Sequence, residues 1–287
     1  MHVTHLAGAL WACCLLCLPT LSQAVEPTHR DVEYARVTEQ ILKLDLYAAA
    51  EAGDRSPLVI WIHGGAWRSG SKDHVPIAGL LEQGFAIASV EYRLSPVAPF
   101  PAQVHDIKAA IRFLRSSADR YQLDPERFII AGASAGGHLA ALVGVSAGVE
   151  ELEGSVGAHL SESSAVQAIV SYYGAANLQT ILAQSTPHGL SVRVPALQLL
   201  LGGQPAEQPR LARLASPVAH VDSGDPPLWL LHGDQDPQMP INQAHELVGV
   251  YQAAGLSVDF QVVHGAAHGG PQFTTPARLD QLAQQLK

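Results

Sequence analysis

A serine stands between two glycines at residues 132–136, in the sequence Gly-Ala-Ser-Ala-Gly. The apolar run 128–131 before it is typical of a buried parallel strand, and the residues 138–145 after it favour a helix. A G-x-S-x-G pattern between a strand and a helix is typical of a nucleophile elbow, a sharp turn that exposes the serine Oγ. Ser134 is therefore the candidate nucleophile, and the amide of Ala135 at the helix start is a candidate donor to an oxyanion.

The sequence His-Gly-Gly-Ala-Trp at residues 63–67 directly follows a second apolar run. Paired glycines let a backbone approach a ligand closely and aim its N–H groups at it. We predict that Gly65 and Ala135 supply the oxyanion donors, with Gly64 or Ala66 as alternatives. Trp67 either shapes a pocket wall or packs under the loop, and the sequence leaves both open.

A serine hydroxyl needs a base within hydrogen-bond reach, and the base needs a carboxylate that fixes its tautomer. Two aspartates, Asp234 and Asp236, and two histidines, His264 and His268, follow later predicted strands. His264 directly abuts its strand, whereas His268 lies deeper in a glycine-flanked loop with more freedom to reach the serine. We therefore favour His268 as the base, but spacing alone does not separate the aspartates.

The elements that must position these residues alternate between strand and helix along most of the chain. This alternation predicts an α/β fold with a mostly parallel sheet covered on both faces, and ligands of such sheets bind beyond the carboxyl ends of the strands. The predicted strands are 40–47 (a half-exposed edge strand), 58–62, 85–90, 128–131, 168–172, 228–231 and 258–263, and the predicted helices are 75–83, 103–118, 138–145, 240–254 and 271–286.

Two loop regions complete this prediction. Tyr92 opens a proline-containing loop, 92–101, at the carboxyl end of a predicted strand, and we assign it with Trp67 to the substrate pocket. Residues 177–216 combine leucines with four prolines and lack a strand-helix rhythm, which favours a small lid over a separate domain.

The first 24 residues are typical of a secretory signal peptide. Leu6 to Leu18 is an apolar run of the right length for such a signal and too short to span a membrane. A buried first helix is the alternative, because the segment before the run has no Lys or Arg. The signal predicts a secreted or periplasmic protein with one hydrolase-like domain over 25–287. All three cysteines lie inside 1–24, so the processed chain would hold no disulfide or thiolate site.

Composition narrows the partners of the chain. Its 287 residues carry a formal net charge of −9 and no basic run, which argues against a nucleic-acid partner. The 14 histidines include no H-E-x-x-H or paired Cys/His spacing, and no dinucleotide or P-loop glycine pattern occurs. We therefore expect neither a metal nor a cofactor. The sequence leaves the oligomeric state open.

Four motifs in the order HGGAW, GASAGG, HGDQDPQMP and GAAHGG resemble the secreted carboxylesterases of the α/β-hydrolase superfamily, in particular the bifunctional feruloyl and acetyl xylan esterases. The resemblance extends from about residue 37 to the C-terminus. In that group the acid is the aspartate of H-G-x-x-D-x-x-V-P, which matches Asp236 here, with Met239 in place of the valine and Pro240 retained. The resemblance likewise places the base at His268 and makes Asp234 a turn residue.

The resemblance implies a serine esterase that cleaves short acyl or aryl esters, such as acetyl or feruloyl groups on a small molecule or a plant polysaccharide. The predicted lid matches least, so the acyl and alcohol preferences stay open. Two other readings remain: an arylformamidase or peptidase-like amide hydrolase with the same machinery, and an inactive hydrolase fold that serves as a binding module.

Overall fold

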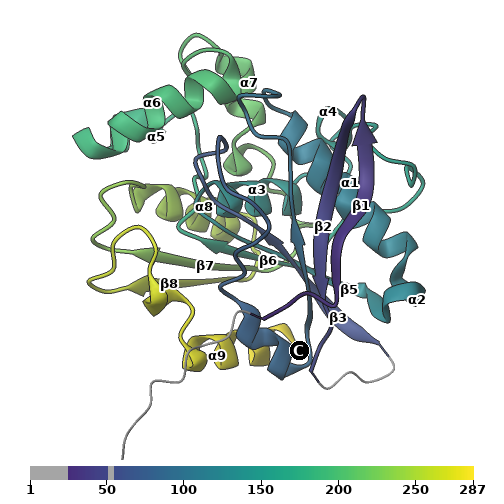
Figure 1. Ribbon diagram of the computed structural model, residues 1–287. Helices are drawn as coiled ribbons and strands as arrows, with labels where there is room; N and C mark the ends of the chain where they lie inside the picture. Colours follow the sequence, from purple (N-terminus) through teal and green to yellow (C-terminus); the bar gives the residue numbers. More distant parts are fainter. Residues whose placement is uncertain (1–24, 51–54) are drawn as a thin grey trace, which may run out of the picture.

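A computed structural model describes residues 25–50 and 55–287, and the predicted signal peptide lies outside the described residues. The chain forms an eight-stranded sheet in the order β1-β2-β4-β3-β5-β6-β7-β8 (Figure 1). β2 is antiparallel to both β1 and β4, and every other neighbouring pair is parallel. The strands are β1 (His29–Val37), β2 (Gln40–Tyr47), β3 (Ser56–Ile62), β4 (Ala86–Val90), β5 (Leu123–Ala133), β6 (Ala168–Tyr172), β7 (Leu228–Gly233) and β8 (Val258–Val263).

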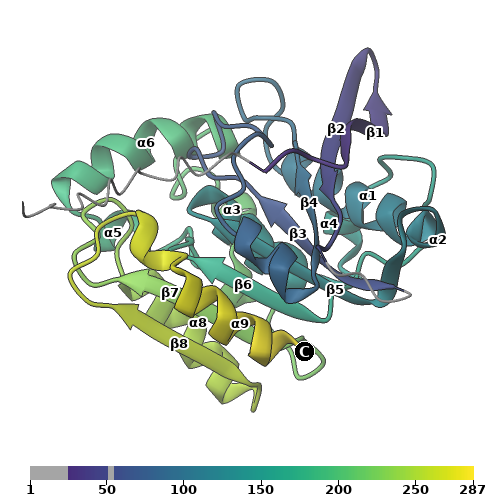
Figure 2. The ribbon, with the colours of Figure 1, turned by 60° about the horizontal axis from the view of Figure 1, so that its bottom comes forward.

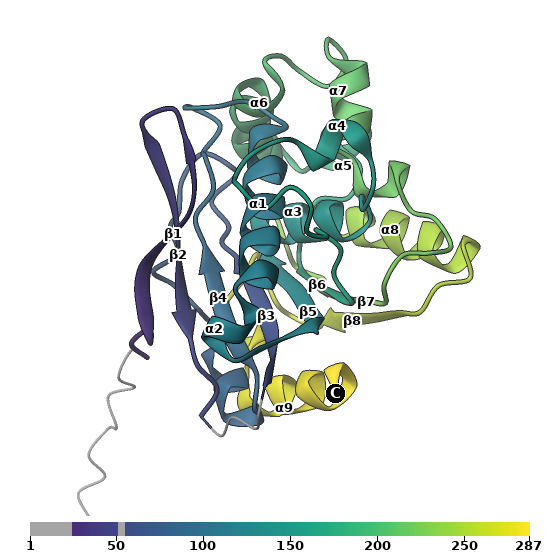
Figure 3. The same ribbon diagram turned by 90° about the vertical axis from the view of Figure 1, so that its right-hand side faces the viewer.

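Helices cover both faces of the sheet. The longer ones are α1 (Ala102–Ser116), α3 (Ala135–Gly144), α6 (Pro187–Leu201), α8 (Asn242–Ala253) and α9 (Pro276–Leu286). The short ones are α2 (Ala118–Tyr121), α4 (Glu150–Glu153), α5 (Ile181–Gln184) and α7 (Pro209–Leu214), with the 3₁₀ turns η1 (Ala78–Gln83), η2 (Pro217–Ala219) and η3 (Pro271–Phe273). Figure 2 shows α9 lying across one face, and Figure 3 shows α1 and α3 against the other.

The central strand β3 shows why continuous apolar runs end up in the middle of such a sheet. Leu58, Ile60 and Ile62 pack into the core shared with α1, α3 and α8, while Val59 and Trp61 pack into the core under η1 and α9. Successive side chains of a strand point to opposite faces, so a strand covered on both sides is apolar at every position. The buried central strands therefore hold in place the loops that follow their carboxyl ends.

Two sequence predictions for the first half of the chain are wrong. β2 is not an edge strand, because β1 pairs along its outer side and leaves Leu44 and Asp45 almost fully buried. β1 escaped prediction because its sequence, HRDVEYARV, is largely polar and exposed. The predicted helix 75–83 is instead the 3₁₀ turn η1, which covers only Ala78–Gln83 and is capped by Gly84, whose φ is 86°.

Residues 177–216 form α5, α6 and α7, the helices at the top of Figure 1. One of the four prolines lies inside a helix, since α6 runs through Pro195 for 15 residues. Its hydroxyl cap is Thr186, which accepts a hydrogen bond from the Gly189 amide at 3.0 Å. Within 25–50 and 55–287 no helix is long and apolar enough to cross a membrane.

Candidate active site

Ser134 occupies a strained turn between β5 and α3. Its φ of 57° and ψ of −117° belong to a conformation that non-glycine residues rarely adopt. The turn fits only because its neighbours are glycines: a Cβ on Gly132 would lie 2.3 Å from the Gly136 oxygen, and one on Gly136 would lie 2.0 Å from the Ile62 oxygen. The predicted elbow is therefore present in the structure.

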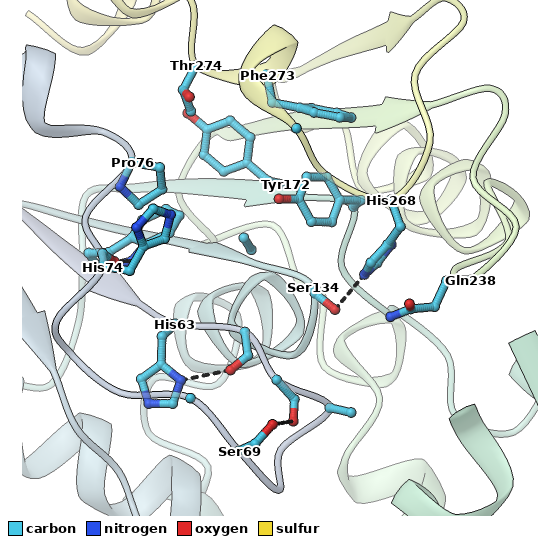
Figure 4. Close-up of a pocket in the computed structure, with 18 of the residues that line it drawn as sticks. His63, Ser69, His74, Pro76, Ser134, Tyr172, Gln238, His268, Phe273 and Thr274 are labelled. Atoms are coloured by element: carbon cyan, nitrogen blue, oxygen red, sulfur yellow. Dashed lines mark hydrogen bonds between the residues drawn. The ribbon is translucent and has the colours of Figure 1, made fainter. Parts of the chain in front are cut away.

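The structure brings Ser134, His268 and Asp236 into one hydrogen-bonded chain, and Figure 4 shows its Ser134–His268 link. The Ser134 hydroxyl lies 2.8 Å from His268 Nε2, and His268 Nδ1 lies 2.6 Å from Asp236 Oδ2. These contacts assign the neutral imidazole the tautomer in which Nδ1–H donates to the carboxylate and Nε2 accepts from the hydroxyl. The arrangement is that of a nucleophile, a base and an acid in series.

Asp236 is enclosed, and both of its carboxylate oxygens accept hydrogen bonds. Its side chain is 0% exposed, and Oδ1 accepts the amides of Gln238 and Met239, both at 2.8 Å. His232 Nε2 lies 3.5 Å from Oδ2, although its shorter contact is with the Met239 carbonyl, at 3.0 Å. Burial alone would raise the pKa of Asp236, but donors from His232, His268 and the Met239 amide hold it well below its usual range.

The rejected candidates, Asp234 and His264, form a second pair from the same two loops. His264 Nδ1 lies 2.8 Å from Asp234 Oδ2, and the Gly265 amide donates to Oδ1 at 2.7 Å. His264 is 85% exposed, and neither residue lines the cavity beside Ser134. The structure thus separates two aspartates that their spacing could not.

The loop after β3 lies against the elbow as the glycine pair predicted. A Cβ on Gly64 would lie 2.9 Å from the Ala133 oxygen and 3.4 Å from the Ser134 Cβ. Gly65 adopts a φ of 112°, open to glycine and strained for other residues. In the described part of the chain, the Gly64 and Gly65 amides have no backbone acceptor, and Ala135 begins α3, where amides lack a helical partner. These three amides remain the candidate oxyanion donors.

Trp67 and Tyr92 are not pocket residues, which corrects that prediction. Trp67 is fully buried, and its Nε1–H donates to His138 Nδ1 at 3.0 Å. Tyr92 is 4% exposed, stacks on the His63 ring at 4.4 Å and donates its hydroxyl to the His63 carbonyl at 3.0 Å. Both side chains turn inward and support the loop from below, so their contribution to the site is to hold the glycines in place.

A cavity of about 940 Å³ opens beside Ser134. Figure 4 shows Tyr172, Phe273 and Pro76 gathered on the side of the cavity away from Ser69. Its described lining contains no residue of the predicted lid 177–216 and no carboxylate. The residues that line the cavity include Trp61, Gly64, Gly65, Ser134, Tyr172, Gln238, His268 and Phe273.

Sequence reasoning missed two residues that brace the base and the acid. The Tyr173 ring contacts His268 edge-on, with the centroids 4.8 Å apart, and its backbone has a φ of 41°. Arg193, on α6, is 1% exposed and donates to the Gln238 carbonyl at 2.8 Å, two residues beyond Asp236. Neither position stands in a recognisable motif, since each acts through a neighbour that is remote in sequence.

Metal chemistry has no donor set in the part of the chain that the structure describes. Within residues 25–50 and 55–287, no group of three or more His, Cys, Asp or Glu side chains converges in a way that could hold an ion. The histidines near the site serve instead as hydrogen-bond partners: His138 bridges Trp67 and the Ala215 carbonyl, and His232 reaches the Met239 carbonyl.

Comparison with known proteins shows the family and the fold of the chain. The family model BD-FAE matches residues 44–250, most of the chain. The chain belongs to the BD-FAE family. Solved structures with the same fold include a truncated carbohydrate esterase from gut microbiota, 32% identical with a TM-score of 0.82 over 92% of this chain and 96% of that one. The bifunctional GH43-CE of Bacteroides eggerthii is 33% identical with a TM-score of 0.80, over 90% of this chain and 34% of that one. The α/β-hydrolase fold expected from the motifs is confirmed.

Curated relatives of this BD-FAE member include two esterases of Mycobacterium tuberculosis (strain ATCC 25618 / H37Rv). Esterase LipQ and Esterase LipC are each 32% identical over 221 residues, which is 75% of this chain. The chain spans about half the length of these relatives, 51% of LipQ and 53% of LipC. The resemblance to carboxylesterases is thereby confirmed at the level of the family.

Proposed function

We propose that this BD-FAE member is a serine carboxylesterase that works through an acyl-enzyme. The observation that carries the proposal is the continuous hydrogen-bond chain from Ser134 through His268 to Asp236. Its serine end lies at a cavity, beside loop amides that have no backbone acceptor in the described part of the chain. Relatives named as esterases, each 32% identical, support the choice of bond.

The proposed reaction follows from the roles of these atoms. Ser134 Oγ attacks the ester carbonyl carbon while His268 Nε2 takes the hydroxyl proton, and Asp236 stabilises the imidazolium that results. The amides of Gly65 and Ala135, with Gly64 beside them, donate to the oxyanion of the tetrahedral intermediate. His268 then returns the proton to the leaving alcohol, and a water molecule, deprotonated by the same imidazole, hydrolyses the acyl-enzyme.

The proposed substrates are short acyl or aryl esters carried by a carbohydrate. The 32–33% identical solved structures described as a carbohydrate esterase and as a bifunctional GH43-CE support this class. Trp61, Tyr172 and Phe273 offer aromatic surface to an acetyl, butyryl or feruloyl group. The cavity is open and lacks a lid residue in its described lining, which suits an ester on a bulky alcohol.

We further propose export, with residues 1–24 removed. Sequencing the mature N-terminus of the protein recovered from outside the cytoplasm tests this, and an intact Met1 on the recovered protein contradicts it.

Active-site labelling tests the mechanism directly. A fluorophosphonate should label the wild type at Ser134, and Ser134→Ala should lose both labelling and at least about 10⁴-fold of kcat. An unlabelled wild type would instead favour an inactive binding module. The substrate is tested with p-nitrophenyl acetate and butyrate, methyl ferulate, acetylated xylan and a formyl-arylamine. Faster turnover of the formamide than of any ester would show that the protein is an amide hydrolase rather than an esterase.

A further inference from the structure

Arg193 is a buried cation whose position the reaction described so far does not explain. Its side chain lies on α6 with 1% exposure, and Nη2 donates to the Gln238 carbonyl at 2.8 Å and lies 3.7 Å from Met239 Sδ. Nε has no hydrogen-bond partner, and within the described residues no carboxylate lies within 4.0 Å of the guanidinium. A charge in such a place is costly unless something nearby offsets it.

The offsetting charge is Asp236. It lies two residues before Gln238, its side chain is 0% exposed, and its carboxylate is the anion to which the neighbouring groups point. Burial lowers the pKa of Arg193 to about 10, and the negative charge of Asp236 opposes that lowering. The two charges are therefore coupled across the loop without touching.

The same helix also fixes the loop mechanically. Three successive carbonyls each accept one hydrogen bond: Pro237 from the Thr186 hydroxyl at 2.6 Å, Gln238 from Arg193, and Met239 from His232 at 3.0 Å. Two of these three donors come from α6 or its cap. The segment predicted to be a lid thus holds the loop that carries the acid, while the Gln238 side chain faces the cavity (Figure 4).

We propose that Arg193 is a positioning residue for the ester hydrolysis, which fixes the loop of Asp236 and Gln238 and, through its charge on Asp236, opposes the uptake of a proton by the hydrogen-bonded Asp236–His268 pair. This inference rests on the proposed function. The titratable groups that face Arg193 or the pair in the described part of the chain include His138 of α3, His232 of β7 and Tyr173 after β6, and Arg193 is the cation among them. A buried cation that acts on one member of a hydrogen-bonded acid–base pair disfavours the protonated form of the pair, so the acid limb of the pH profile lies at lower pH.

The test is the pH profile of kcat/KM on p-nitrophenyl acetate. Arg193→Gln and Arg193→Met both remove the positive charge but introduce side chains of different shape, and Arg193→Lys keeps the charge. Thr186→Val is the matched control, because it removes a hydrogen bond to the adjacent carbonyl of the same loop without changing charge. Far-UV circular dichroism and the melting temperature establish that each variant is folded.

The neutral variants should lose about tenfold of kcat, and their acid limb should move to higher pH by about 0.5 to 1 unit. Arg193→Lys should keep the wild-type limb, and Thr186→Val should lose kcat several-fold with an unmoved limb. If both neutral variants fail to fold while Arg193→Lys folds and keeps the limb, the requirement for charge stands.

A folded neutral variant whose limb coincides with that of the wild type would overturn the inference. So would Thr186→Val moving the limb as far as Arg193→Gln, since loop loosening alone would then explain the shift. Failure of the proposed function is distinguishable, because the wild type itself would then show neither labelling nor turnover.

Discussion

Two Asp–His pairs join the loop after β7 to the loop after β8, and the two pairs differ in how far they are exposed to solvent. Asp236–His268 and Asp234–His264 have similar separations, 2.6 and 2.8 Å. The first pair is enclosed, with its side chains 0% and 14% exposed, whereas those of the second are 31% and 85% exposed. The hydrogen bond between the partners is therefore not what distinguishes an acid–base pair in this fold.

The difference is desolvation together with a third partner. Asp236 accepts three hydrogen bonds from the protein and is shielded from solvent, so its charge acts on His268 in a medium that water screens poorly. His268 in turn has Ser134 at 2.8 Å, whereas His264 is surrounded by solvent. Charges in water interact weakly, and the outer pair serves only to tie two turns together.

The largest effect on kcat is expected when each of the two histidines is replaced in turn by alanine. His268→Ala removes the base and should lower kcat by about 10⁴- to 10⁶-fold. His264→Ala should stay within about threefold of the wild type, because solvent replaces its one side-chain partner. Ester hydrolysis with a saturating substrate measures both, and a comparable loss in the two variants would break the contrast between the pairs.

A second buried histidine, His138, extends the contrast between enclosed and exposed histidines to the pH dependence of the unfolding free energy. Burial lowers the pKa of His138 to about 4, so the unfolded chain binds its proton first as the pH falls below 6.5. The stability that the neutral imidazole contributes is fully present above pH 6.5 and is lost as the pH falls toward 4, about 3 kcal/mol in all. Urea unfolding of the wild type and His138→Gln at several pH values measures it. The unfolding free energies should converge by that amount between pH 7 and 4, and a constant gap would contradict the linkage.

Crowding at the enclosed site can be probed with a single methyl group. Gly64→Ala would place a Cβ 2.9 Å from the Ala133 oxygen, so the oxyanion loop must shift and kcat should fall by about 10- to 100-fold. Gly249→Ala is the control, since nothing lies within 4 Å of its added Cβ. Equal kcat values for the wild type and Gly64→Ala would show that the loop amides do not take part in the mechanism.

The smallest expected effect concerns the support beneath that loop. Trp67→Phe removes the donor to His138 Nδ1 and should lower the free energy of unfolding by about 1–2 kcal/mol, with kcat changed less than about tenfold. Thermal melting of the variant beside His264→Ala measures the difference between a buried and an exposed hydrogen bond. A variant as stable as the wild type would show that water replaces the indole donor.

The sequence was most informative where one local pattern determines the structure. The glycines around Ser134 and the apolar runs before each loop predicted the elbow and the carboxyl-end edge, because backbone room and burial on both faces each demand particular residue types. β1 escaped because an exposed outer strand needs no apolar period. Trp67 and Tyr92 were misplaced because a position next to a loop does not say which way the side chain turns. Arg193 was missed because its partners lie 45 and 46 residues away.

The most direct measurement of the central claim compares Asp236→Asn with Asp234→Asn. The first variant keeps the shape of the acid but withdraws the carboxylate that holds the tautomer of His268, so kcat should fall by about 10⁴-fold in a folded protein. The second should hydrolyse esters within about threefold of the wild type. If Asp236→Asn retains near-normal turnover, or Asp234→Asn loses as much, the enclosed pair is not the one that drives the serine.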